Sequence, residues 1–211
     1  MNYKQELIQI AVFAEQKGFV NAYEGNISVI DRLNGKIYIT PSGTRKLTLT
    51  EDQIAVVDSR TGNQIEGSRK RSSEIKLHMA AYEMRPDCNG VVHAHCPYLT
   101  AYAMCGMSIE ANCHEEFLVT RDIPCIPHGK AGTEKIFNGL KDAIVDHDLV
   151  LLGNHGALCV GKTLDRAFMI MEAMETTVKG YTIACQIGTP KKIPDWDELY
   201  AKASENIHTN N

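Results

Sequence analysis

Hydrophobic residues recur at helical spacing along much of the chain. In the first segment Leu7, Ile10 and Ala14 lie three or four residues apart, and Gly18 follows as a typical helix end. The long pattern over residues 164–187 is rich in methionine, which in a helix indicates packing rather than a cofactor site. Such patterns predict helices over residues 3–17, 75–81, 98–105, 133–145 and 164–187, then a short helix around residues 196–200 and a polar tail.

Shorter apolar runs with β-branched residues predict strands. Residues 149–152 are apolar throughout, which is typical of a strand buried on both faces. This run breaks at residues 153–156 and then resumes as a predicted hairpin partner. Two prolines within residues 123–129 exclude a central strand through that segment. One predicted strand occupies the last part of the segment 21–29, after its glycine and asparagines. The other predicted strands cover residues 36–40, 54–58, 90–96, 149–152 and 157–161.

The length and charge of the chain narrow the classes of protein. With 211 residues, 44% of them hydrophobic, we expect one domain over residues 1–211, with residues from about 190 to 211 peripheral. A net charge of −4, from 22 basic and 26 acidic side chains, gives no basic face for nucleic acid. The longest apolar runs are far too short to span a membrane. We therefore expect neither nucleic acid nor a membrane as a partner.

The cysteines and the first residues indicate the compartment. The chain has seven cysteines, an odd number, and the sequence contains no C-x-x-C pair. Free thiols in a reducing cytoplasm are therefore the favoured interpretation. The first residues include an acidic side chain and open an amphipathic helix, which does not fit a signal peptide. The sequence thus predicts a cytoplasmic protein.

Two histidines lie two positions apart in the strand predicted over residues 90–96. Side chains alternate between the faces of a strand, so His93 and His95 point to the same side, although such histidines also occur fully hydrogen-bonded in cores. His155 lies at a strand break beside glycine, where Asn154 can orient an imidazole. A site of three histidines leaves coordination positions open, as catalytic metal sites do. Its ligands favour zinc, and manganese, cobalt or iron also suit them.

Two loops rich in hydrogen-bond donors precede the histidines. Residues 41–44 (Pro-Ser-Gly-Thr) follow a predicted strand and can aim N–H and O–H groups at an anion, although any β-turn can share this composition. Ser72, Ser73 and Glu74 precede a predicted helix, where a serine cap and an acidic first turn explain them equally well. Helix N-termini also bind phosphate, so both interpretations stay open. His78, within that helix, is interpreted as a structural histidine.

Five short motifs occur in one order along the chain. They are residues 25–28 (Gly-Asn-Ile-Ser), 40–44 (Thr-Pro-Ser-Gly-Thr), 72–74 (Ser-Ser-Glu), 92–95 (Val-His-Ala-His) and 154–156 (Asn-His-Gly). Together they resemble the class II aldolase family typified by L-fuculose-1-phosphate aldolase, and the resemblance covers most of the chain. It implies a single α/β domain in which a central, mostly antiparallel β-sheet lies between layers of helices. It also implies a homo-oligomer, commonly a tetramer, with active sites at subunit boundaries.

The resemblance further implies roles for individual residues. His93, His95 and His155 would bind one divalent metal per subunit, usually zinc, and Glu74 would be the acid–base group. The substrate would be a small sugar phosphate. The residues that would line the pocket for its phosphate are Asn26, Ser42, Gly43, Ser72 and Ser73.

Retro-aldol cleavage is the reaction that these roles imply. We expect the C2 carbonyl and C3 hydroxyl of a ketose 1-phosphate to chelate the metal, whose Lewis acidity stabilises the enediolate left when C3–C4 breaks. Glu74 would protonate C3 and release dihydroxyacetone phosphate and an aldehyde. An epimerase or dehydratase of the same family keeps the metal and phosphate loops, so both remain alternatives. A non-catalytic metal-binding protein has no reason to combine Glu74 with the histidines and these loops.

The sequence departs from the family pattern at the end of the pocket that takes the aldehyde. Fuculose-phosphate aldolases place a tyrosine from a neighbouring subunit where this chain has His114, which can shuttle the C4 hydroxyl proton. Residues 23–24 (Tyr-Glu) replace small residues expected there and narrow the pocket. A deoxyketose phosphate such as 5-deoxyribulose 1-phosphate is therefore a second candidate substrate beside L-fuculose 1-phosphate. Other candidates for the second acid–base group are Glu115, Glu116 and His128.

Overall fold

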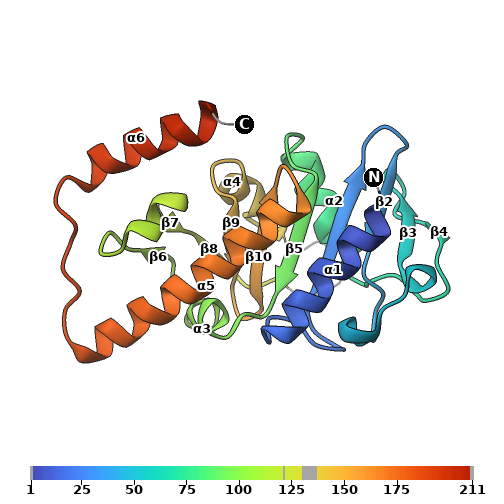
Figure 1. Ribbon diagram of the computed structural model, residues 1–211, viewed down its shortest axis with the longest axis horizontal. Helices are drawn as coiled ribbons and strands as arrows, with labels where there is room; N and C mark the ends of the chain where they lie inside the picture. The colour runs from blue at the N-terminus through green and yellow to red at the C-terminus, as the bar shows by residue number, and fades with distance from the viewer. Residues whose placement is uncertain (1, 121, 130–136, 210–211) are drawn as a thin grey trace.

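An eight-stranded, mostly antiparallel sheet forms the centre of the protein (Figure 1). The computed structural model describes residues 2–120, 122–129 and 137–209, with side chains up to residue 203. In their order across the sheet, the strands are β4 (Gln64–Glu66), β3 (Ala55–Asp58), β2 (Lys36–Ile39), β1 (Asn26–Asp31), β5 (Gly90–Ala94), β10 (Gly156–Gly161), β9 (Leu149–Leu152) and β8 (Cys125–Ile126). Neighbouring strands are antiparallel except β8 and β9, which are parallel. The expected fold class is confirmed.

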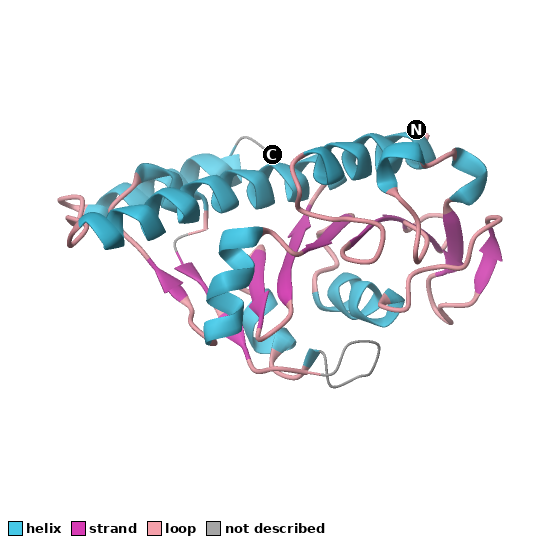
Figure 2. Cartoon of the chain, turned by 90° about the horizontal axis from the view of Figure 1, so that it is seen from below, coloured by secondary structure: helices cyan, strands magenta, loops and turns pink. Residues whose placement is uncertain are grey.

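Layers of helices cover both faces of this sheet (Figure 2). One layer contains α1 (Tyr3–Gln16), α3 (Pro97–Cys105) and α5 (Leu164–Ile187), and the other contains α2 (Ile75–Met84) and α4 (Leu140–Ile144). Each layer buries its apolar side chains in a core of its own against the sheet. The sheet is therefore desolvated on both sides, and polar groups in its central strands are shielded from water.

The alternation of side chains along β5 assigns each residue to one of these cores. Val92 and Ala94 pack in the core under α1, α3 and α5, together with Cys96 after the strand end. Val91 packs in the core on the side of α2 and α4. His93 alternates with Val92 and Ala94 and therefore lies on the α2 side, where it is fully buried. The sheet thus directs His93 toward the start of α2.

Most of the predicted elements agree with the structure. The long helix predicted over residues 164–187 is α5, and the predicted hairpin of residues 149–152 with 157–161 is β9 and β10. The prolines of residues 123–129 leave room for only short strands there among the described residues: β8 at the sheet edge, and β7 (Asp122–Ile123), which pairs with β6 (Ile109–Glu110). β3 and β4 also pair as an antiparallel hairpin at the far edge of the sheet.

Two predicted helices differ from the structure. The last one is not a short helix with a polar tail, because α6 (Trp196–Thr209) continues for 14 residues. No glycine or proline interrupts it, and Glu198 and Lys202 form an i,i+4 ion pair at 2.6 Å. In the helix predicted over 133–145, residues 133–136 lie outside the described part of the chain. The observed helix, α4, begins only after Gly139, whose φ of +81° is not helical.

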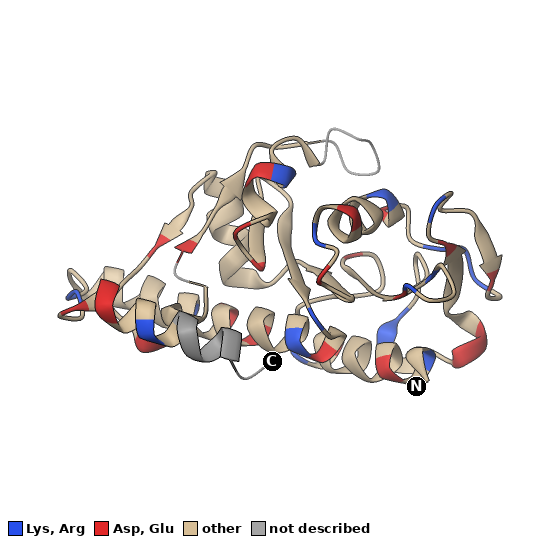
Figure 3. Cartoon of the chain, turned by 90° about the horizontal axis from the view of Figure 1, so that it is seen from above, with Lys and Arg blue, Asp and Glu red and all other residues tan. Residues whose placement is uncertain are grey.

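Charged residues of both signs are spread over the described chain. In the view of Figure 3, segments that carry Lys or Arg lie among segments that carry Asp or Glu. Among the described helices, none combines the length and the apolar character that a membrane crossing requires.

Candidate active site

The three histidines lie together beside the middle of the sheet. His93 is in β5, His95 directly follows that strand, and His155 lies in the turn from β9 to β10. β10 pairs with β5, with Leu158 opposite His93, so the turn returns to the end of β5. One ligand atom from each ring lies within 4.8 Å of the other two. The tertiary structure therefore brings together three side chains that span more than sixty positions of sequence.

Close backbone contacts fix the turn that carries His155. A Cβ atom at Gly156 would lie 2.7 Å from the carbonyl oxygen of Ala94 and 2.9 Å from Cδ2 of His95, so this approach requires glycine. Asn154 has a φ of +55°, and its backbone N–H and side-chain amide donate to carbonyl groups at the C-terminal end of α3. Asn154 thus anchors the turn to α3 and does not orient an imidazole.

Burial keeps the three imidazoles neutral. It lowers the pKa of His93 to about 3, and it also lowers the pKa of His95 and that of His155. Nδ1–H of His93 donates to the carbonyl oxygen of Ala157 at 2.9 Å, which leaves Nε2 as the nitrogen with a free lone pair. Neutral imidazoles are the form that binds metal ions.

Other contacts of these rings fit a divalent cation. Nε2 of His93 lies 3.3 Å from Nε2 of His95 and 3.4 Å from Oε2 of Glu74, so three atoms that can each bind a cation lie close together. Tetrahedral zinc, with Zn–N bonds of about 2.0–2.1 Å, holds its nitrogen ligands about 3.3 Å apart. Nδ1 of His155 is buried and has no hydrogen-bond partner in the described chain, which also fits a polar group awaiting a ligand.

Glu74 lies at the point where the helix α2 meets the histidines. It occupies the N-cap position of α2, so the prediction that a serine caps this helix is wrong. Its Oε1 is 3.4 Å from Nε2 of His155, and its Oε2 accepts a hydrogen bond of 2.6 Å from Nδ2 of Asn26. Burial raises the pKa of Glu74, but His93 and the Asn26 hydrogen bond outweigh burial, so the pKa lies below its ordinary value. Glu74 is therefore an ionised carboxylate within reach of two histidines.

A small hollow of about 40 Å³ opens beside Glu74. The loop after β2 and the loop before α2 form it, held together by a bridge between Pro41 and Arg71 and by the N–H of Ser42, which donates to the carbonyl of Lys70. All five residues implied by the resemblance to bind phosphate line this hollow, together with Glu74 and Lys46: Asn26, Ser42, Gly43, Ser72 and Ser73. Donors from three separate parts of the chain thus converge on one space.

Lys46 is a residue of this hollow that the sequence analysis missed. Its side chain is 2% exposed, and its ammonium group donates to the backbone carbonyls of Asn21 and Glu24. Burial lowers the pKa of Lys46, and the carboxylate of Glu15 opposes this shift. No spacing or motif distinguishes this lysine from surface lysines. Only its burial in the folded chain shows that it places positive charge beside the hollow.

His114 lies apart from the histidine cluster. It is exposed and caps η3 (Glu115–Val119), and it lines a separate surface hollow with residues of α5. Glu115 and Glu116 are exposed in the same helix. His128 lies nearer to the cluster, because its Nδ1 donates to the carbonyl of Gly153 in the turn that carries His155. The structure of one chain therefore does not unite His114 with Glu74.

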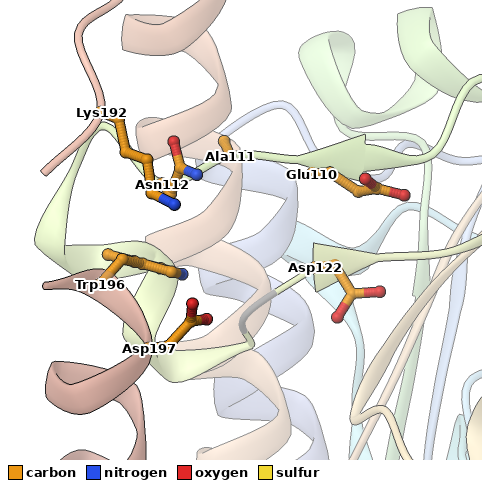
Figure 4. A pocket seen from close by; sticks show the side chains of 7 residues that line it. All are labelled: Glu110, Ala111, Asn112, Asp122, Lys192, Trp196 and Asp197. Atoms are coloured by element: carbon orange, nitrogen blue, oxygen red, sulfur yellow. The ribbon is translucent and has the colours of Figure 1, made fainter.

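A larger hollow, of about 500 Å³, lies under α6 (Figure 4). Glu110 and Asp122 of the β6–β7 ribbon lie on one side of it, and Lys192, Trp196 and Asp197 of the C-terminal segment lie on the other. It contains none of the histidines or donor loops, so size does not identify the active site here. The residues that line it are Glu110, Ala111, Asn112, Asp122, Lys192, Trp196 and Asp197.

Comparisons with known proteins agree with this geometry. The family model described as class II aldolase and adducin N-terminal domain matches residues 5–182. The 5-deoxy-D-ribulose 1-phosphate aldolase of Bacillus thuringiensis serovar kurstaki is 30% identical over 196 residues, which cover 93% of this chain and 91% of that protein. The L-fuculose phosphate aldolase of Methanocaldococcus jannaschii is 33% identical over 176 residues, which cover 83% of this chain and 93% of that protein.

A solved structure shares the whole architecture. The structure of an L-fuculose 1-phosphate aldolase superposes with a TM-score of 0.87 and 32% sequence identity, covering 97% of this chain and 96% of that one. The match extends over both helix layers and the sheet, and therefore over every segment that contributes to the histidine cluster and the donor-lined hollow.

Proposed function

Because the chain belongs to the family of class II aldolases and adducin N-terminal domains, we propose that it is a metal-dependent aldolase acting on a ketose 1-phosphate. The reaction cleaves the C3–C4 bond and gives dihydroxyacetone phosphate and a short aldehyde. One observation carries the proposal: the carboxylate of Glu74 lies 3.4 Å from two neutral histidines of the cluster and borders the donor-lined hollow. An acid–base group, a metal site and an anion site are therefore adjacent.

The proposed metal ligands are His93, His95 and His155. Class II aldolases depend on a divalent metal, and three imidazoles favour zinc, with manganese, cobalt or iron as alternatives. When bound, such an ion supplies Lewis acidity that stabilises negative charge on the substrate oxygens at C2 and C3. The contribution of the chain is to hold the rings neutral and correctly turned, through burial and the hydrogen bond from His93 to Ala157.

The proposed phosphate site is the hollow between the two donor loops. The hydroxyl groups of Ser42 and Ser72 and the backbone N–H of Gly43 can each approach a phosphate oxygen there, and the amide of Asn26 borders the same space. Gly43 has a φ of +62°, a conformation that favours glycine and turns the loop around the hollow. The buried Lys46 adds positive charge to the lining of the hollow, which favours the binding of a dianion such as phosphate.

The proposed proton carrier at C3 is Glu74. In the synthetic direction the ionised carboxylate of Glu74 removes a proton from C3. In cleavage Glu74 first takes up a proton, which balances the proton that leaves the C4 hydroxyl, and delivers it to C3. The structure supports this role because Oε1 of Glu74 is buried without a hydrogen-bond partner among the described residues and is free to face a substrate. Oε2 is held by Asn26, which fixes the orientation of the carboxylate.

The second acid–base group is proposed to come from another subunit of a homotetramer. His114 is exposed, and the contacts of its own chain do not join it to the histidine cluster, so it can act only at the site of a neighbour. Glu115, Glu116 and His128 remain the other candidates. Exposed apolar residues such as Met104, Met107 and Met169 provide surface for subunit contacts.

The aldehyde end of the substrate is the open part of the proposal. The candidates are L-fuculose 1-phosphate and 5-deoxyribulose 1-phosphate, and relatives with both names match over most of their length. An epimerase or dehydratase that uses the same metal and phosphate sites is the alternative. Cytoplasmic location is part of the proposal, since all seven cysteines are free thiols. We also propose that the chain works as one domain with α6 at its periphery.

Direct assay of the products tests this function. Purified protein loaded with zinc is incubated with each of the two ketose 1-phosphates, and dihydroxyacetone phosphate is measured by coupled oxidation of NADH. We expect triose phosphate from at least one substrate. If neither substrate yields it in the presence of metal, while the carbon skeleton is epimerised or dehydrated, the aldolase proposal fails and the alternative holds.

A further inference from the structure

A buried chain of hydrogen bonds leads from α2 through β1 to Glu74. Oη of Tyr82 lies 2.7 Å from Oγ of Ser28, and this oxygen lies 2.6 Å from Nδ1 of His78. Nε2 of His78 is 2.5 Å from Oδ1 of Asn26, whose Nδ2 donates to Oε2 of Glu74 at 2.6 Å. Ser28 and His78 are fully buried, and Tyr82 and Asn26 are nearly so. Each link therefore depends on its protein partner rather than on water.

The hydrogens of this chain have one direction that satisfies every group. The phenolic hydrogen of Tyr82 needs an acceptor in its buried position, and Oγ of Ser28 is the oxygen that lies beside it. Ser28 then uses its own hydrogen for Nδ1 of His78. The neutral ring consequently carries its hydrogen on Nε2 and donates it to Oδ1 of Asn26. The reverse direction would leave the phenolic hydrogen unpaired in the core.

We propose that His78 is a positioning residue that, with Ser28 and Tyr82 behind it, fixes which way the side-chain amide of Asn26 points. An amide turned by 180° exchanges its oxygen and nitrogen within nearly the same shape. Here the oxygen is held by His78, so the NH2 group faces the active site. One hydrogen of Nδ2 goes to Glu74, and the other remains for a ligand oxygen in the hollow that Asn26 lines.

The choice of histidine at this position supports a role beyond filling space. The other fully buried positions of α2, such as Ile75, Leu77 and Ala81, are apolar. A leucine at position 78 would fill a similar volume, but it would leave Oδ1 of Asn26 without a donor. The amide could then turn its carbonyl toward the Glu74 carboxylate, where two oxygens repel each other.

The orientation itself can be observed without any assay of activity. Neutron diffraction from crystals of the perdeuterated protein locates the hydrogen isotopes directly. We expect deuterium on Nε2 of His78 and not on Nδ1, and both amide deuterons of Asn26 on the side of Glu74. Deuterium on Nδ1 of His78, or the carbonyl of Asn26 facing Glu74, would overturn the proposal.

A binding experiment tests the consequence, which rests on the proposed phosphate site. Calorimetry measures the affinity of zinc-loaded protein for inorganic phosphate. Ser28→Ala removes the donor to His78, and we expect it to weaken phosphate binding by about 5- to 10-fold, the effect of losing one well-placed buried hydrogen bond. Thr100→Val is the matched control, because this buried hydroxyl has no hydrogen-bond partner in the described chain. It should change the affinity by less than about 2-fold.

A double-mutant cycle separates positioning from general damage. In an Asn26→Ala background there is no amide to orient, so adding Ser28→Ala should have almost no further effect on phosphate affinity. Equal weakening in both backgrounds would show that Ser28 does not act through Asn26, and it would overturn the proposal. If the unaltered protein does not bind phosphate, the proposed phosphate site fails, and the neutron result still decides the orientation.

Discussion

The metal end and the aldehyde end of the proposed pocket are built in different ways. At the metal end, His93 is fully buried in the central strand and Glu74 is held by Asn26. At the aldehyde end, His114 is exposed in a short helical turn far from that network. A single chain can therefore fix the groups that handle the metal and the C3 proton, because its own sheet and helix layers surround them. Under the proposed mechanism, a neighbouring subunit would complete the other end.

Removal of the metal should give the largest loss of activity. Dialysis against a chelator is expected to lower C3–C4 cleavage to background, because the neutral histidines then hold no Lewis acid. Metal content by mass spectrometry and the coupled assay check this together. Zinc should restore the rate, and the same treatment of a His155→Ala variant should not be reversible. Full activity in metal-free protein would contradict the proposed role of the metal site.

The substitution Glu74→Gln should give the second largest loss of activity. Loss of the acid–base group is expected to lower kcat by about 10²- to 10⁴-fold while zinc stays bound. Exchange of the C3 proton of dihydroxyacetone phosphate with deuterium, followed by NMR, isolates this step from the aldehyde end. The exposed Glu110→Gln serves as the control. Retained exchange in Glu74→Gln with metal bound would remove Glu74 from the mechanism.

His114→Ala should affect the other end alone. If His114 carries the C4 hydroxyl proton, cleavage should fall by about 10²-fold, at the low end for an acid–base group, with C3 exchange unchanged. Mixing this variant with Glu74→Gln protein, under conditions that reassemble subunits, should recover activity if His114 acts on a neighbour. Parallel losses of cleavage and exchange would place His114 in the metal end instead.

Ser72→Ala should give a smaller effect that belongs to binding. Ser72 is buried in the lining of the hollow, and loss of one hydrogen bond to phosphate should raise KM by about 10-fold with little change in kcat. Steady-state kinetics on the phosphorylated substrate measure both constants. Ser59→Ala, in a turn outside the hollow, should leave both constants unaltered. A loss confined to kcat would contradict a role in phosphate binding.

The pH dependence of stability tests how firmly the buried network holds. Burial lowers the pKa of His78 to about 4, whereas an unfolded histidine titrates near 6.5. Between these values the unfolded chain binds the extra proton, so the stability due to neutral His78 is present above pH 6.5 and is lost as pH falls toward 4. Urea unfolding should show about 1.4 kcal/mol lost per pH unit from this group. If the His78→Gln variant lost as much unfolding free energy per pH unit as the unaltered protein, the assignment of this loss to His78 would be wrong.

Much of the metal end could be predicted from the sequence because its signals are local. The spacing of His93 and His95 on a strand gives a common face, and the glycine after His155 marks a close approach that the Ala94 carbonyl confirms. The Pro41 to Thr44 and Ser72 to Glu74 segments marked the donor loops. Helix periodicity likewise placed α5 at its observed bounds.

The remaining errors and omissions arise where neighbours in space decide. Asn154 was expected to orient an imidazole, but α3 lies beside it and takes its amide. Lys46 and His78 carry no recognisable spacing, and their importance depends on burial against β1 and the loops around it. The C-terminal helix continued beyond its predicted end, where no glycine or proline interrupts it.

By itself the sequence determined which residue types could do the chemistry and which strands and helices would carry them, since hydrophobic period and turn residues act over a few positions. Only the tertiary structure decided which of these residues meet. Packing of two helix layers on one sheet removed water from His78 and His93 together, which keeps both imidazoles neutral, and it placed Asn26 between His78 and Glu74, where its amide donates to the carboxylate.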